Sequence, residues 1–156
     1  MKLISGSVVI YHAVPAALTA IARSREPKET GGLLVGWWDR DKIVIRHILE
    51  VPDNDATASS WTRNEARASE ALEQFLTQAE HPWLGYIGDW HTHPAPVGPS
   101  HTDKRSIRRA ARSIGHPLAL IVHRSDATLD VLAVRHGIVG RTPWTTYRHD
   151  YQEESP

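Results

Sequence analysis

The segment GDWHTHPAPVGPSHTD, residues 88–103, holds the side chains of this sequence best suited to chemistry. In an extended chain, residues two apart point to the same side, so His91 and His93 can reach one point in space while Thr92 faces away. Asp103 falls in the first turn of a predicted helix and can fold back toward the two imidazoles. Two imidazoles and one carboxylate leave a fourth tetrahedral position open, as in catalytic zinc sites. Such an ion makes water a nucleophile at neutral pH.

Each part of this pattern also has a purely structural interpretation. The spacing Ser100-x-x-Asp103 is that of a capping box, and the helix dipole favours an acid in the first turn. Two histidines in a loop can be solvated or hydrogen-bonded without a metal. The combination is more specific, because a helix cap does not require His-x-His-Pro upstream. The sequence contains no His-Glu-x-x-His, so a zinc site carried on one helix is not supported.

Hydrolysis at such a site needs a base that takes a proton from water and returns it to the leaving group. Glu29 is the candidate, because it precedes the glycine pair Gly31-Gly32 and an apolar strand, where the backbone can approach closely. The alternative is an ordinary surface glutamate beside a turn.

The elements that would position these residues interleave strands and helices, which predicts a mixed α/β domain. A nearly continuous apolar run at 31–38 predicts a strand buried on both faces, and 40–51 predicts its hairpin partner. Helices are predicted at 15–24, from 64 to about 80 and from 103 to about 114, and further strands at 8–12, 83–91, 118–123, 128–134 and 137–147.

The composition narrows the function classes further. The 156 residues suit one compact domain, predicted over 1–148, followed by a polar tail at 149–156. The absence of cysteine excludes a thiol nucleophile and a cysteine-based zinc finger. No apolar run approaches the roughly 20 residues that cross a bilayer, so we expect a soluble, cytoplasmic protein with no membrane partner.

Taken together, Glu29-Thr-Gly-Gly-Leu-Leu-Val-Gly, then Trp-His-Thr-His-Pro and Pro-Ser-x-x-Asp, resemble the JAMM metalloproteases, also called MPN+ or JAB. The compact prokaryotic JAB domains are the most similar branch. The resemblance covers most of the chain, because the predicted element order fits as well. It implies a single domain with a mixed β-sheet flanked by helices, similar in architecture to cytidine deaminases.

The resemblance also implies an activity, a cofactor and roles for five residues. The activity is zinc-dependent hydrolysis of an amide or isopeptide bond after the C-terminus of a ubiquitin-like protein, with one Zn²⁺ per chain. His91, His93 and Asp103 match the zinc ligands, and Glu29 matches the general acid/base. Ser100 matches the serine that donates a hydrogen bond to the oxyanion, which is compatible with a cap because a hydroxyl can donate and accept at once. The five residues between Pro94 and Ser100 make this loop slightly shorter than is usual in the family.

The implied partner is a ubiquitin-like protein, as a conjugate or a fusion, with E1- or E2-like proteins as associates. The pathway would be bacterial, either antiviral modification or processing of a sulfur-carrier-like precursor. One alternative is a non-catalytic scaffold of the same fold, which the intact set of site residues disfavours. Another is a DNA-associated protein, since a DNA-repair branch shares the signature. Neutral net charge disfavours it, and its only support is a basic helix face made of Lys104, Arg105, Arg108, Arg109 and Arg112.

Two further expectations concern residues near the predicted site. His101 is expected to point to solvent, because a fourth protein ligand would close the metal site. Trp61 lies in a polar loop and is a candidate for contacting a partner. Four other tryptophans lie in or beside predicted strands and are expected to pack there, namely Trp37, Trp38, Trp83 and Trp90.

Overall fold

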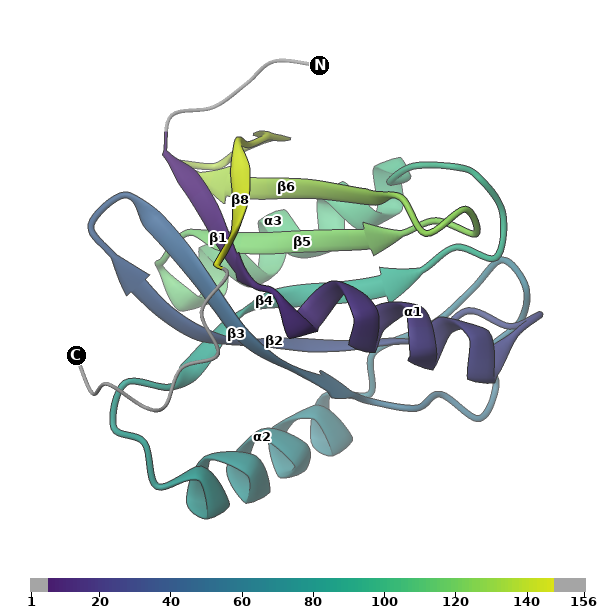
Figure 1. The fold of residues 1–156 in the computed structure, drawn as a ribbon, viewed down its shortest axis with the longest axis horizontal. Helices are drawn as coiled ribbons and strands as arrows, with labels where there is room; N and C mark the ends of the chain where they lie inside the picture. Colours follow the sequence, from purple (N-terminus) through teal and green to yellow (C-terminus); the bar gives the residue numbers. More distant parts are fainter. Residues whose placement is uncertain (1–5, 148–156) are drawn as a thin grey trace.

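One curled sheet of eight strands forms the centre of the computed structural model, which describes residues 6–147 (Figure 1). The strand order is β7-β6-β5-β4-β2-β3-β1-β8, with parallel and antiparallel neighbours. The elements are β1 (Ser7–Tyr11), α1 (Ala13–Arg25), β2 (Gly31–Asp39), β3 (Lys42–Glu50), α2 (Glu65–Ala79), β4 (Gly85–Thr92), α3 (His101–Ile114), β5 (Leu118–His123), β6 (Leu129–Arg135), β7 (Ile138–Arg141) and β8 (Trp144–Tyr147). The predicted mixed sheet flanked by helices is confirmed.

The helices cover the two faces of the sheet unequally (Figure 1). Helix α1 packs on one face through Val14 and Leu18, while α3 packs on the other face through Ile107. Strand β5 is buried along its whole length because alternate side chains enter the two cores. Helix α2 lies on the α3 side and buries only Ala68.

Strand β4 lies inside the sheet and carries the histidines at its C-terminal end. It pairs antiparallel with β2, where Gly31 lies opposite His91, and parallel with β5, where Thr92 lies opposite His123. The pairing brings the chain just after Glu29 beside the histidines, although about 60 residues separate them in sequence.

The prediction of a single strand over 137–147 is wrong. This segment forms two strands at opposite edges of the sheet, β7 beside β6 and β8 beside β1. Thr142 and Pro143 separate them, and proline cannot donate a ladder hydrogen bond. Instead the Pro143 carbonyl accepts a hydrogen bond from the Val8 N–H, which starts the pairing with β1.

The tryptophan prediction is confirmed for Trp90 and wrong for Trp83. Trp90 is fully buried in the α1-side core, whereas Trp83 is 53% exposed in the turn before β4, which begins at Gly85. Trp38 lies at the surface, where its ring stacks on His116. The predicted tail at 149–156 lies outside the described residues. Within residues 6–147, no helix is long and apolar enough to cross a membrane.

Candidate active site

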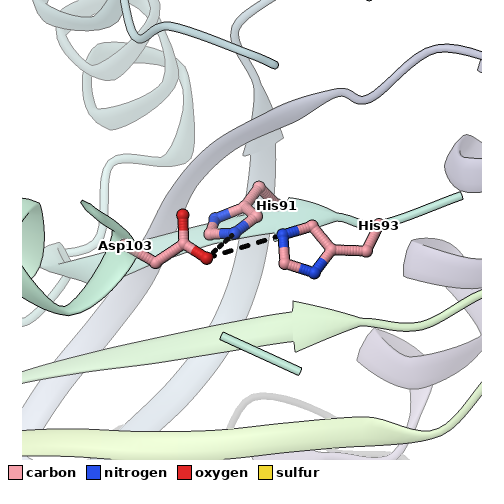
Figure 2. Close-up of side chains that lie close together, drawn as sticks. All are labelled: His91, His93 and Asp103. Carbon is pink, nitrogen blue, oxygen red and sulfur yellow. Dashed lines mark ion pairs between the residues drawn. The ribbon is translucent and has the colours of Figure 1, made fainter. Parts of the chain in front are cut away.

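Three predicted ligands converge where β4 ends and α3 begins (Figure 2). His91 and His93 come from the end of β4, and Asp103 comes from the first turn of α3. Oδ2 of Asp103 lies 3.2 Å from Nε2 of His91 and 3.5 Å from Nε2 of His93. The three candidate ligand atoms all lie within 4.8 Å of one another.

The geometry of this cluster fits a shared metal ion better than a hydrogen-bonded ion pair. Nε2 of His91 is buried and has no hydrogen-bond partner, although the Asp103 carboxylate is close. Two ligand atoms, each about 2.0–2.1 Å from a tetrahedral zinc ion, lie about 3.3 Å apart. The two distances to Asp103 lie on either side of that value, so an ion coordinated by all three side chains would satisfy the orphaned nitrogen.

The orientation of His93 is fixed by contacts behind it. Its Nδ1 lies 3.0 Å from the carbonyl oxygen of Val97, and its backbone N–H donates to the carbonyl of His123. A carbonyl only accepts, so the imidazole hydrogen belongs on Nδ1 and the Nε2 lone pair faces the site. Metal-binding histidines are commonly oriented in this way.

The capping box predicted at Ser100 and Asp103 is present. The Ser100 hydroxyl accepts from the Asp103 N–H at 3.1 Å, and the Ser100 N–H donates to Oδ2 of Asp103 at 2.7 Å. The oxygen that faces the histidines is therefore also held by the helix cap. Ser100 is exposed and its hydroxyl hydrogen is not used in the box. The helix cap and the contact of Asp103 with the two histidines therefore coexist.

Glu29 lies beside the cluster, at the entrance to β2. Its Oε1 is 3.9 Å from Nε2 of His93, and its side chain is only 11% exposed. Its backbone N–H donates to the carbonyl of Thr57, which ties it to the loop before α2. Burial raises the pKa of Glu29. A glutamate with a raised pKa can hold and release a proton closer to neutral pH.

The carboxylate of Asp103 stays ionised. Burial alone would raise its pKa, but the His91 and His93 rings and the Ser100 N–H together lower it well below its usual range. In return, Asp103 raises the pKa of His93, so a metal ion and a proton compete for that ring.

A groove of about 810 Å³ leads away from the site between α2 and α3, above the α3-side face of the sheet. Glu29, His91 and Asp103 lie at one end, and Ile114 lines the groove at the far end of α3. Trp61 forms part of the wall, with its ring stacked near His91 at 6.5 Å and its indole N–H bonded to the Val51 carbonyl. It is thus placed to touch whatever enters the groove.

The floor of this groove contains an ionic cluster that the sequence analysis missed. Arg63 donates to Oδ1 of Asp89 at 2.6 Å, and the Tyr86 hydroxyl donates to the same oxygen at 2.8 Å. Arg63 also pairs with Glu65 at 2.9 Å. Burial raises the pKa of Asp89, and Arg63 acts in the opposite direction. The one signal in the sequence for this cluster was that Asp89 lies two residues before His91 and therefore shares its face of the strand.

The remaining sequence expectations near the site fall on the surface of α3. His101 is exposed, as expected. The basic residues of α3 make no ion pair within residues 6–147, and Arg109 is the one that lines the groove.

With this geometry in view, the chain can be compared with known proteins. Residues 12–136 match the family model described as prokaryotic homologs of the JAB domain. The chain belongs to this family. The JAB domain accounts for the resemblance that the site motifs first indicated.

Curated relatives of this JAB domain carry the names of hydrolases. A probable metalloprotease of Sinorhizobium fredii is 36% identical over 91 residues, which cover 54% of each protein. A CD-NTase/cGAS isopeptidase of Vibrio cholerae is 30% identical over 125 residues, covering 76% of this chain and 77% of the relative. An Escherichia coli protein of the same name is 29% identical over 99 residues, covering 63% and 64%. The chain thus spans about half the length of the S. fredii relative. These names support a peptidase or isopeptidase function in general terms.

A solved structure shares the fold. The solution structure of a Desulfitobacterium hafniense protein superposes with a TM-score of 0.70 at 17% identity, covering 91% of this chain and 94% of the other. This likeness concerns the fold alone.

Proposed function

We propose that this JAB domain is a zinc-dependent isopeptidase or peptidase that cleaves the amide bond after the C-terminus of a ubiquitin-like protein. The observation that carries the proposal is the convergence of Glu29 with His91, His93 and Asp103 at one end of a groove. A helix cap alone would explain Asp103, but not an orphaned imidazole nitrogen or a buried glutamate beside it.

His91, His93 and Asp103 would hold the ion, and two of them, His91 and Asp103, line the groove. A bound divalent ion supplies a Lewis acid that polarises the scissile carbonyl and activates water. Two nitrogens and one oxygen suit zinc, and they also suit iron, cobalt or manganese. We propose zinc because three protein ligands with an open fourth position are typical of its catalytic sites.

Glu29 would move the proton during hydrolysis. Its carboxylate lies beside the ligand cluster without taking part in the helix cap, so it is free to accept the proton of the attacking water. Returning that proton to the leaving nitrogen would release the amine and restore the carboxylate. One residue in this role balances the reaction, because amide hydrolysis consumes one water and transfers one proton to nitrogen.

Ser100 would stabilise the negative charge that develops on the carbonyl oxygen. Its hydroxyl oxygen accepts from the Asp103 N–H, which leaves the hydroxyl hydrogen free to donate. Donors of this kind contribute about 3–4 kcal/mol in comparable sites.

Two observations support a protein tail as the substrate. Two relatives carry the name CD-NTase/cGAS isopeptidase. The groove also follows α3 over its whole length, from Thr102 to Ile114, or about 20 Å. An extended tail at about 3.3 Å per residue would fill it with about six residues.

Metal content and cleavage together test this proposal. We expect about one zinc ion per chain, lost in His91→Ala, and cleavage of a ubiquitin-like fusion by the wild type. Glu29→Gln should keep the zinc and lose cleavage, whereas Asp103→Ala should lose both. A wild-type chain that takes up no metal when zinc is supplied would leave the scaffold alternative as the better one. A Glu29→Gln variant that cleaves at the wild-type rate would remove Glu29 from the mechanism.

A further inference from the structure

Among the described residues, hydrogen bonds reach only one of the two carboxylate oxygens of Asp89. Both of its partners, Arg63 and Tyr86, donate to Oδ1. Oδ2 accepts no hydrogen bond from any described residue, and it is not among the buried atoms that lack a partner. Since Asp89 lines the groove and is 14% exposed, this second oxygen keeps contact with the groove. It offers a free acceptor on a side chain that is otherwise held rigidly.

The charges around Asp89 leave the floor negative. Arg63 is shared between Asp89 and Glu65, so one guanidinium faces two carboxylates. The groove lining as a whole carries four carboxylates against two guanidiniums, the second being Arg109 on the opposite wall. A divalent ion would offset this excess only at the end where Asp103 lies. The Asp89 end therefore favours a cation.

We propose that Asp89, oriented by Arg63 and Tyr86, forms a subsite for a lysine or arginine side chain of the substrate tail. This rests on the proposed function, because it places the tail in the groove. Asp89 lies two residues before His91 on the same face of β4, a spacing of about 7 Å along the strand. An extended chain covers that distance in two residues, which places the basic side chain third from the scissile bond. An ammonium or guanidinium would donate to Oδ2, a charge-assisted hydrogen bond.

The tail in question precedes the scissile bond. Its backbone can extend along the groove for several residues, whereas the group after an isopeptide bond is a single lysine side chain. The cluster is also rigid, because Arg63 has three separate contacts and Tyr86 is bonded at its hydroxyl. A rigid acceptor discriminates better than a mobile one, since no side chain has to be ordered on binding.

A peptide series tests this subsite by binding alone. The probes are heptapeptides of alanine and serine with a free C-terminus, in which one residue is arginine or its uncharged isostere citrulline at each position in turn. Binding to the zinc-loaded wild-type chain is followed by NMR chemical-shift titration. We expect arginine third from the C-terminus to bind at least tenfold more tightly than citrulline, with shifts at the amides of Tyr86 and Asp89.

Variants show whether Asp89 is the cause. In Asp89→Asn, the arginine and citrulline peptides should bind about equally tightly, and the zinc content should stay at the wild-type level. Glu73→Gln, which removes an exposed carboxylate of α2 outside the groove, should leave the preference unchanged. Because Asp89→Asn leaves Arg63 with Glu65 as its one remaining carboxylate partner among the described residues, the double variant Asp89→Asn/Arg63→Gln serves as a second test. It removes both partners and should also lose the preference.

The results separate this proposal from the proposed function. Equal binding of arginine and citrulline peptides at every position, or a preference that survives Asp89→Asn, would overturn the subsite even if a ubiquitin-like fusion is cleaved. An Asp89-dependent preference without any cleavage of such fusions would support the subsite and count against the proposed substrate.

Discussion

Thr30 and Thr92 hold each other through three hydrogen bonds at the junction of β2 and β4. The Thr92 N–H donates to the Thr30 carbonyl at 2.8 Å, and the Thr30 N–H donates to the Thr92 hydroxyl at 3.0 Å. The Thr92 hydroxyl in turn donates to the Thr30 carbonyl at 3.4 Å. Thr30 follows Glu29, and Thr92 separates the two histidines. The pair therefore fixes the candidate base relative to the candidate ligands.

This relationship predicts a specific effect of Thr92→Val. Valine has nearly the same shape but leaves the buried Thr30 N–H without an acceptor, which should cost about 1–3 kcal/mol of stability. We expect zinc content to stay at the wild-type level and cleavage to fall about tenfold as Glu29 loses its fixed position. Thr92→Ser should restore cleavage, because it restores the hydroxyl. Equal cleavage by the valine variant would show that the pair is not needed for positioning.

Ser100 substitutions should separate its two roles. Ser100→Ala removes the cap and should lower the free energy of unfolding by about 1 kcal/mol, measured by urea denaturation. Ser100→Asp caps helices equally well but has no hydroxyl hydrogen, so it should restore stability and not cleavage. We expect cleavage to fall about a hundredfold in both variants. If Ser100→Asp cleaves as well as the wild type, Ser100 serves only as a cap.

Zinc should stabilise the folded chain. At a hundred times its dissociation constant, a ligand that binds only the folded state adds about 2.7 kcal/mol. For a domain of this size that corresponds to about 5–10 °C in Tm. We expect this shift in a thermal melt of the wild type, its reversal by a chelator and its absence in His91→Asn. The matched control is His101→Asn, which alters an exposed neighbour of the site and should keep the shift.

His47, which is not part of the candidate site, should make the stability of the folded chain depend on pH. Burial against Phe75, with help from Arg46 and His81, lowers the pKa of His47 from 6.5 to about 4. Between these values the unfolded chain takes up a proton that the folded chain does not, so stability falls as pH drops from about 6.5 toward 4. Allowing for partial screening by solvent, we expect a contribution of about 2 kcal/mol.

The measurement is urea unfolding at pH 7.5 and pH 5. His47→Gln should lose less stability between the two values than the wild type. His136→Asn alters an exposed histidine in the β6–β7 turn and should match the wild type. If His47→Gln loses as much stability as the wild type, His47 is not the group responsible.

The parts of the candidate site that depend on local chain geometry could be predicted from the sequence. The parts that depend on the register of strand pairing could not. His91, His93, Ser100 and Asp103 lie within one short segment, where strand alternation and helix capping rules apply directly. The position of Glu29 beside them depends on the pairing of β2 with β4. The sequence offered Glu29 as a candidate base from its place before the glycine pair, but a surface glutamate was an open interpretation until the family resemblance matched it to the general acid/base. From Asp89 to His91 the side chains alternate regularly between the two faces of β4, so Asp89 and His91 both line the groove.

The Arg63–Tyr86–Asp89 cluster could not be predicted in this way. A register shift in the pairing of β2 with β4 falls between Tyr86 and Gly88. Tyr86 and Asp89 are three residues apart, so regular alternation would place them on opposite faces, yet both line the groove. Gly88 permits the close approach of β5 there, because a Cβ on it would lie 2.0 Å from the Ala119 carbonyl oxygen.

The placement of β8 beside β1 has a consequence for how the chain folds during synthesis. Val8 pairs with Trp144, so the two ends of the described chain must meet before the sheet is complete. Until β8 leaves the ribosome, the outer edge of β1 remains an unpaired strand edge that can associate with other chains. We therefore expect nascent chains that stop before Trp144 to aggregate more readily than the finished protein, even when every residue of the candidate site has already been made.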